Sequence, residues 1–228
     1  MKRPSMCIII QVKATALCGD KKMYSQNNED QIIAAHFGDY KGTLVEIGAN
    51  DGVTLSNSKL LIEMGWEAHL FEPSIPTFRK LEDLHITNTK VYTYPFGISE
   101  FSGERTFYES GQLLGGEDKS LVSCINPEEM KRWGTKVHFV QTKANFTTWN
   151  EFVKEYGYEE KTFDFISVDA EGEDWNILKQ INMKQHNCKV LCVEWNSIDH
   201  LSEAFVEFAN YFEMKEIHRN AENIIFAK

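Results

Sequence analysis

The stretch that decides the fold is Val45-Glu46-Ile47-Gly48-Ala49-Asn50-Asp51-Gly52. The apolar run from Thr43 to Ile47 predicts a buried β-strand, and the glycines after it predict a tight turn. In an open α/β sheet, ligands bind beyond the carboxyl ends of the strands, so the first group of a ligand should lie at this turn. The residue types in the turn therefore indicate what kind of ligand the protein binds.

The charge of this turn argues against a phosphate. A dinucleotide-binding turn follows G-x-G-x-x-G, in which the second glycine lets a pyrophosphate approach bare backbone amides. Here Asn50 occupies the position of that glycine, and Asp51 follows it. Glu46 adds a third acceptor. A cationic ligand with hydroxyl groups reverses the argument, since each carboxylate can then accept a charge-assisted hydrogen bond worth about 1.5 to 3 kcal/mol. S-adenosylmethionine, with its sulfonium, ammonium and ribose diol, is such a ligand.

Two carboxylates can be assigned to parts of this cofactor. Glu46 and the nearby backbone would hold its methionine end, while Gly48 and Gly52 would let the chain turn tightly against it. In sheets of this kind, an acidic residue about 20 positions past the glycine turn holds ribose hydroxyls. Glu72 lies 20 residues past Gly52 (72 − 52). The order of these features favours S-adenosylmethionine over a chance combination of common motifs.

Beyond the turn, short apolar runs alternate with helical patterns, which predicts an α/β fold built from βαβ units around a parallel sheet. The last two predicted strands form a terminal hairpin. Asn28 is expected to cap the first helix, with His36 in the core. Strands are expected at residues 43–47, 67–71, 90–94, 163–168, 190–195, 213–218 and 223–227. Helices are expected at 28–37, 57–64, 77–84, 149–156, 173–181 and 201–208.

The helix expected at residues 149–156 begins after Thr148. Thr148 and Glu151 form a T-x-x-E capping box, and an apolar stripe with helical spacing follows it up to Gly157.

Between residues 97 and 146 the alternation lapses. A hairpin turn is expected at residues 101–103, and a long irregular stretch after it. Loops this long are typically lids or substrate walls, and a surface insertion without function is the alternative. We therefore expect an N-terminal extension over residues 1–22 and a single domain over 23–228, with an insertion near 97–146.

Composition excludes several classes of protein. With 228 residues, 42% of them hydrophobic, the chain can bury one large core. A net charge of −10 argues against a nucleic-acid partner, and no apolar run approaches the roughly 20 residues that cross a membrane. Five cysteines without a C-x-x-C motif, and an N-terminal apolar stretch broken by Gln11 and Lys13, favour a cytoplasmic location over export.

The ordered motifs resemble a known family. Ser25-Gln26, Glu29-Asp30, the VEIGANDG turn, Ser56-Asn57, Gly65-Trp66, Phe71-Glu72-Pro73, the run from Ile166 to Glu173 and Asn223 before Ile224 are similar to the FkbM-type S-adenosylmethionine-dependent methyltransferases. The resemblance covers residues 24–228. It implies a class I, Rossmann-like fold with a seven-stranded, mostly parallel sheet, helices on both faces and a terminal antiparallel hairpin, and typically O-methylation. Residues 113–133 match poorly, which leaves the methyl acceptor open.

The resemblance and the strand ends together give a cofactor set. In a class I fold, Phe96-Gly97 after the third strand is where adenine would lie, and Gln26 belongs to the family's opening segment, which would fold over the cofactor. Trp133 and Tyr108 are further candidates for stacking on adenine or on a sugar ring. The predicted cofactor-binding residues are Gln26, Glu46, Gly48, Ala49, Asn50, Asp51, Gly52, Glu72, Pro73, Phe96, Gly97 and Asp169.

Acidic side chains at two adjacent strand ends are the catalytic candidates. Asp169 and Glu171 follow one predicted strand, and Glu194 ends the next. Methyl transfer is an in-line displacement that needs the acceptor aligned and its proton removed. Asp169 is the leading base or positioning group, with Glu171 or Glu194 assisting. Two alternatives stay open: the same oxygens hold Mg²⁺ or a similar divalent cation, or they are structural. His138 and His200 are weaker candidate bases.

These expectations define a leading function and two alternatives. The leading function is O-methylation of a hydroxyl on a small molecule, sugar or glycoconjugate, with S-adenosyl-L-methionine as the donor. The alternatives are a nicotinamide-dependent oxidoreductase and a non-catalytic module that binds S-adenosylmethionine. The sequence does not specify the oligomeric state.

Overall fold

The structure is a computed structural model that describes residues 23–113 and 120–228. The predicted extension over residues 1–22 lies outside the described residues. None of the helices within these two ranges combines the length and apolarity needed to cross a bilayer.

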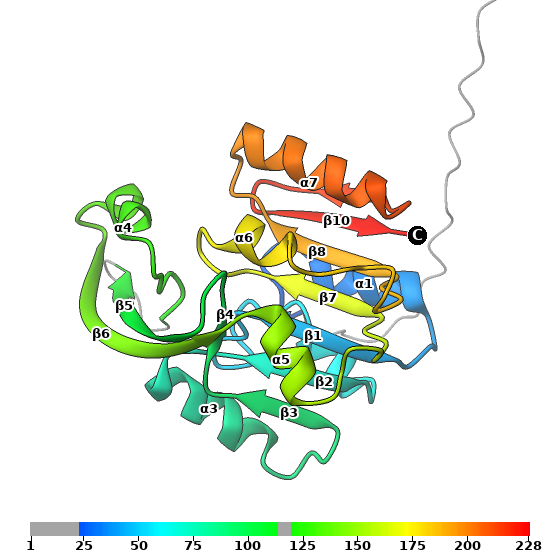
Figure 1. Ribbon diagram of the computed structural model, residues 1–228, viewed down its shortest axis with the longest axis horizontal. Coiled ribbons are helices and arrows are strands. Elements are labelled where there is room, and N and C mark those ends of the chain that lie inside the picture. Colours follow the sequence, from blue (N-terminus) through cyan, green and yellow to red (C-terminus); the bar gives the residue numbers. More distant parts are fainter. Residues whose placement is uncertain (1–22, 114–119) are drawn as a thin grey trace, which may run out of the picture.

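The main sheet has seven strands in the order β3-β2-β1-β7-β8-β10-β9 (Figure 1). Neighbouring strands from β3 to β8 pair in parallel, and β10 pairs antiparallel with both β8 and β9. This confirms the predicted seven-stranded, mostly parallel sheet with a terminal antiparallel hairpin. The strands are β1 (Thr43–Ile47), β2 (Glu67–Phe71), β3 (Val91–Tyr94), β7 (Phe165–Val168), β8 (Val190–Glu194), β9 (Lys215–Arg219) and β10 (Asn223–Ala227).

Helices cover both faces of this sheet, as its residue pattern requires. Along β1, Leu44 packs into one apolar cluster while Val45 and Ile47 pack into the other, because successive side chains of a strand point to opposite faces. One face is covered by α1 (Glu29–Phe37), α2 (Lys59–Glu63) and α3 (Ile75–His85), and the other by α5 (Trp149–Glu155), α6 (Asp174–Leu178) and α7 (Asp199–Tyr211).

The predicted insertion is a second sheet, so the expectation of a long irregular stretch is wrong. Strands β4 (Gly97–Ile98), β5 (Gly103–Leu113) and β6 (Val137–Thr147) form a three-stranded sheet in the order β4-β6-β5, and α4 (Pro127–Trp133) lies between β5 and β6 in the chain. The predicted hairpin at residues 101–103 is also wrong, because β6 separates β4 from β5. In Figure 1 this ribbon and α4 extend away from the main sheet.

The predicted cap of α5 is confirmed, and the predicted cap of α1 is wrong. At α5, the side chains of Thr148 and Glu151 each accept a hydrogen bond from the backbone amide of the other residue, as a capping box requires. Asn28 does not cap α1 with its side chain, because its own backbone is left-handed (φ 69°). His36 is exposed, not in the core, since α1 buries Ile33 and Ala34 instead.

Candidate active site

A cavity of about 330 Å³ opens at the carboxyl ends of the central strands. The turns after β1, β2, β7 and β8 form one side of the cavity. The second sheet, the connection between β5 and α4, and α4 itself form the other side through Phe107, Val122, Cys124, Ile125, Arg132, Trp133 and Phe146. The cavity therefore lies where the rule for open α/β sheets places ligands.

The turn after β1 is packed directly against the turn after β7. Gly48 has a left-handed backbone (φ 88°), and a β-carbon on it would lie 1.8 Å from the carbonyl oxygen of Asp169. The backbone amides of Gly48 and Ala49 both donate to the Phe71 carbonyl, at 3.1 and 2.9 Å. Glycine at position 48 is thus required for the strand ends to meet at the cavity.

Glu46 lies in the cavity wall, but its oxygens already have protein donors. They accept from the Ser58 hydroxyl (2.5 Å), the Asn57 amide (3.0 Å) and the Ser56 hydroxyl (3.2 and 3.3 Å). Burial raises the pKa of this carboxyl to about 7, against the lowering effect of these bonds. These bonds also explain why α2 begins only at Lys59, two residues later than predicted. The contact of Glu46 with the methionine end of the cofactor stays a prediction.

Glu72 is buried and retains acceptor capacity toward the cavity. Its two oxygens accept from the backbone amides of Asn50 (3.0 Å) and Ser74 (2.7 Å). Burial raises its pKa to about 7, and the nearby Glu109 and Asp51 add to this rise. A carboxylate offers about four lone pairs, so two remain available for the hydroxyls of a ribose.

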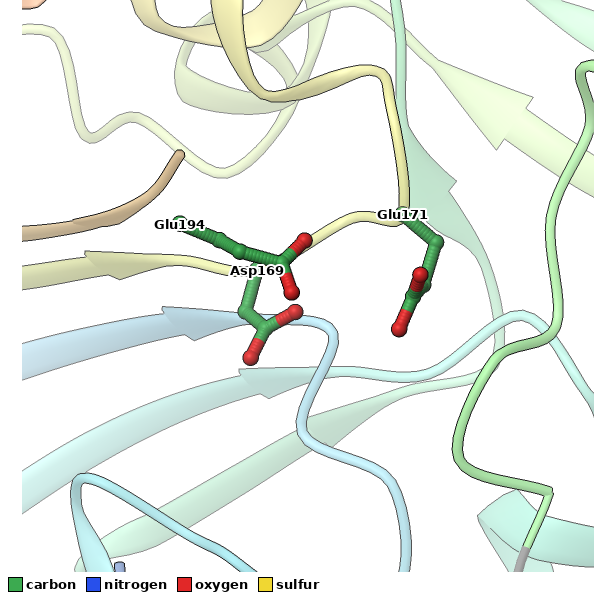
Figure 2. A group of neighbouring side chains, drawn as sticks. All are labelled: Asp169, Glu171 and Glu194. Carbon is green, nitrogen blue, oxygen red and sulfur yellow. The ribbon is translucent and has the colours of Figure 1, made fainter. Parts of the chain in front are cut away.

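Three carboxylates meet at the adjacent ends of β7 and β8. Figure 2 shows Asp169 and Glu194 reaching toward each other, with Glu171 on the turn beyond β7. One oxygen from each of the three lies within 4.8 Å of the other two. At that separation, two full charges repel by roughly 3 to 4 kcal/mol for an effective dielectric of about 20. The predicted juxtaposition of these three residues is present in the structure.

Burial makes full ionisation of this acidic cluster (Asp169, Glu171, Glu194) unfavourable. It raises the pKa of Asp169 to about 7, and the charges of Glu46 and Glu29 add to the rise. Burial and then the Asp169 charge raise the pKa of both Glu171 and Glu194 well above the ordinary value. Glu194 is 8% exposed, and its Oε2 has no hydrogen-bond partner among the described residues.

Asp174 fixes the turn that carries two of these carboxylates. At the start of α6, its oxygens accept from the backbone amides of Ala170 (2.8 Å) and Gly172 (3.2 Å). Between them Glu171 has a left-handed backbone (φ 47°), which is unfavourable for a non-glycine residue. Asp174 is not among the predicted site residues, so its control of this turn was missed.

The structure places the other predicted cofactor residues in two groups. Gln26, Asn50, Pro73 and Gly97 line the cavity together with Gly48, Ala49, Glu46 and Glu72. Asp51, Gly52 and Phe96 do not line it. Asp51 instead accepts from the backbone amides of Val53 (2.9 Å) and Thr54 (2.7 Å), while Gly52 packs against Leu81. Phe96 packs against Phe71 and Tyr94.

Several residues that line the cavity were not predicted as site residues. Asn57, Asn196 and Asn223 lie at its edge with Glu173 and Glu222. Asn57 and Asn223 occur in the motifs that carry the family resemblance, and that signal could have found them. The lining residues from α4 and from the connection before it fall in the poorly matching segment, and of these only Trp133 was named as a stacking candidate. Phe107 of β5 lies outside that segment and was not predicted. His138 and His200 are exposed and lie outside the residues that line the cavity.

This combination of fold and site defines a family. The Methyltransferase FkbM domain matches residues 46–219, which is more than half of the chain, and the chain belongs to this family. Comparison with curated protein sequences finds no match.

Several solved structures are similar to this chain. An S-adenosylmethionine-dependent O-methyltransferase from Thermotoga maritima has a TM-score of 0.49 and 9% identity, covering 91% of this chain and 67% of that one. Aeropyrum pernix fibrillarin, solved with natively bound S-adenosyl-L-methionine, has a TM-score of 0.45 and 8% identity, covering 91% and 83%. Precorrin-6y C5,15-methyltransferase from Geobacter metallireducens has a TM-score of 0.43 and 10% identity, covering 92% and 95%.

The family match agrees with the prediction made from the charge of the first turn. The protein is an S-adenosylmethionine-dependent methyltransferase of class I fold. Family membership also favours methyl transfer over the nicotinamide-dependent alternative.

Proposed function

We propose that this protein methylates a hydroxyl oxygen on a small molecule, sugar or glycoconjugate. The acidic cluster, at the edge of the cavity where β7 and β8 end, carries this proposal. A hydroxyl must lose its proton during methylation, and a carboxylate whose pKa lies near 7 is suited to accept a proton at neutral pH. Asp169, with a pKa of about 7, is the leading acceptor of that proton.

The proposed step is a displacement at the methyl carbon. A lone pair of the acceptor oxygen attacks the methyl group as the carbon–sulfur bond breaks, and the electron pair of that bond stays on sulfur. The products are a methyl ether and S-adenosylhomocysteine, and the hydroxyl proton passes to the acidic cluster. The protein contributes mainly by alignment and by removal of this proton.

The far side of the cavity supports an acceptor of modest size with both apolar and polar faces. Val122, Cys124 and Ile125 give it an apolar surface, and the Nε1 of Trp133 is a buried donor without a partner in the described residues. The Arg132 guanidinium lies over the Trp133 ring, 5.5 Å from its centroid. An aromatic face beside hydrogen-bonding groups is a common arrangement for holding a sugar ring.

The test has two parts. Calorimetry should show one S-adenosylmethionine bound per chain, and a panel of hydroxylated small molecules and glycosides should yield S-adenosylhomocysteine with a methyl ether product identified by mass spectrometry. Asp169→Asn should lower kcat by 10²- to 10⁴-fold, the usual range for loss of a general base.

A matched control is Asp83→Asn, an exposed acid on α3 that should not affect turnover. A product methylated at nitrogen or carbon would contradict the proposal. Cofactor binding without turnover on any acceptor would support the non-catalytic binding module instead.

A further inference from the structure

The spacing of the acidic cluster suits a single metal ion. Oxygens from Asp169, Glu171 and Glu194 lie within 4.8 Å of one another. Three oxygens that are at most 4.8 Å apart lie no more than about 2.8 Å from a common centre, close to the roughly 2.3 to 2.6 Å at which Ca²⁺ binds oxygen, so a small side-chain adjustment lets all three contact one divalent cation. Hard cations prefer carboxylate and amide oxygens, and Asn196 lines the same part of the cavity.

Among the described residues, no cation makes an ion pair with this cluster. Arg132 is close enough to lower the pKa of Glu171, but its guanidinium pairs with Glu129 at 3.4 Å. Asp174 and Glu46, which lie near the cluster, are acids as well. Three carboxylates facing one point, with Glu194 buried and Asp169 and Glu171 half-buried, therefore need protons or a bound cation.

An independent observation concerns the Glu194 side chain. It is more than nine-tenths buried, and its Oε2 has no hydrogen-bond partner within the described part of the chain. Figure 2 shows this carboxyl group directed toward Asp169. Buried acceptors are rarely left unsatisfied, so an orphan oxygen aimed into an acidic cluster indicates a missing partner of positive character.

We infer that Asp169, Glu171 and Glu194 bind one divalent cation that contacts the acceptor hydroxyl. The inference rests on the proposed function, since the cation would lie where the acceptor meets the methyl donor. A cation there draws electron density from the hydroxyl and makes it more acidic, so that its proton leaves more readily. Each carboxylate then binds the cation through one oxygen, and the second oxygen of Asp169 accepts the proton.

The experiment uses Mn²⁺ as the probe, on the full chain freed of metal by a chelator. Electron paramagnetic resonance measures free Mn²⁺, whose signal is lost on binding. We expect one site per chain, present with and without S-adenosylmethionine, and methyl transfer that a chelator abolishes and Mn²⁺ restores. Glu194→Gln should weaken Mn²⁺ binding at least tenfold. Glu203→Gln, which removes an exposed acid of α7, should change it less than twofold.

Three binding results would overturn the inference: no saturable Mn²⁺ binding, equal binding by Glu194→Gln, or displacement of Mn²⁺ by S-adenosylmethionine. The last would mean that the cofactor's own positive charge neutralises the cluster. Thermal unfolding of Glu194→Gln shows whether the variant is folded, and Asp169→Asn serves as a second test of the ligand set. Methyl ether formation that persists in chelator would overturn the inference of a bound cation and leave the proposed function intact. The absence of ether formation with Mn²⁺ present would count against the proposed function.

Discussion

A β-carbon on residue 48 would lie 1.8 Å from the carbonyl oxygen of Asp169. The Asp169 amide in turn donates to the Ile47 carbonyl at 3.0 Å, so the turns after β1 and β7 form one packed unit. The first turn lines the cavity, and the second carries Asp169 and Glu171 of the acidic cluster. Their close approach links the shape of the predicted cofactor site to the position of the candidate base.

Gly48→Ala should therefore impair cofactor binding. The added methyl group meets a backbone atom that cannot rotate away, and alanine is also disfavoured at φ 88°. We expect S-adenosylmethionine affinity to fall at least tenfold by calorimetry, with a stability loss of about 2 kcal/mol or more. Gly38→Ala is the matched control, since φ is 58° there but no described atom lies within 4 Å of the new methyl group. Wild-type affinity in Gly48→Ala would show that the two turns can separate without loss.

Glu72→Gln tests the predicted ribose contact. In the structure both Glu72 oxygens accept from backbone amides, so a side-chain amide would place a donor against Asn50 or Ser74 and remove a charged acceptor. Loss of a hydrogen bond to a charged group costs about 1.5 to 3 kcal/mol, which corresponds to roughly a 10- to 100-fold weaker cofactor affinity. Glu82→Gln, an exposed acid on α3, should leave the affinity unchanged. An unaffected Glu72→Gln would remove this residue from the cofactor site.

Sequence reasoning succeeded where the signal was local. The bounds of β1 and β2 agree residue for residue with the prediction, because each is a buried run between turn residues. The meeting of Asp169 and Glu194 followed from a general rule, since carboxyl ends of neighbouring parallel strands share one edge of a sheet. The sequence does not indicate that the Asp51 side chain accepts from the backbone amides of Val53 and Thr54 instead of facing the cavity.

The second sheet could not be predicted in the same way. Strand β6 has mostly exposed or half-buried residues, so its sequence lacks the clear apolar alternation of a core strand. Its stability comes from pairing with β5 across a long connection, for example Phe107 with Thr142. Contacts of this kind are absent from any local pattern, and the acceptor side of the cavity depends on them.

Thr148→Ala should destabilise the fold without changing the site. The Thr148 hydroxyl accepts from the Glu151 amide at 3.2 Å, and the Glu151 carboxylate accepts from the Thr148 amide. Loss of such a cap costs about 1 kcal/mol, or roughly 2 to 4 °C in Tm for a chain of this size. Thr135→Ala, at an exposed turn, is the control and should leave Tm unchanged. Since α5 lies outside the cavity lining, a change in cofactor affinity would be unexpected.

The stability of the cofactor-free protein should fall as pH rises from 6.5 to 8. Burial raises the pKa of four cavity or near-cavity carboxyls to about 7, from ordinary values near 4: Glu46, Glu72, Asp169 and Asp174. The folded state then binds more protons than the unfolded state between these values, so the stabilisation is complete below about pH 4 and is lost as pH rises through about 7. Burial lowers the pKa of His69 and His85 to about 4. These two histidines make the stability of the folded state rise with pH, but only below about pH 6.5.

Thermal unfolding at several pH values, with and without ligand, measures this effect. Asp169→Asn removes one of the four groups, so its Tm should fall less steeply over the same pH range than that of the wild type. Saturating S-adenosylmethionine should also flatten the profile, because a cationic ligand favours the ionised carboxyls. A wild-type Tm that rises between pH 6.5 and 8 would mean that these carboxyls are already ionised in the folded protein, and that a bound cation or a compensating protein charge accompanies them even without the cofactor.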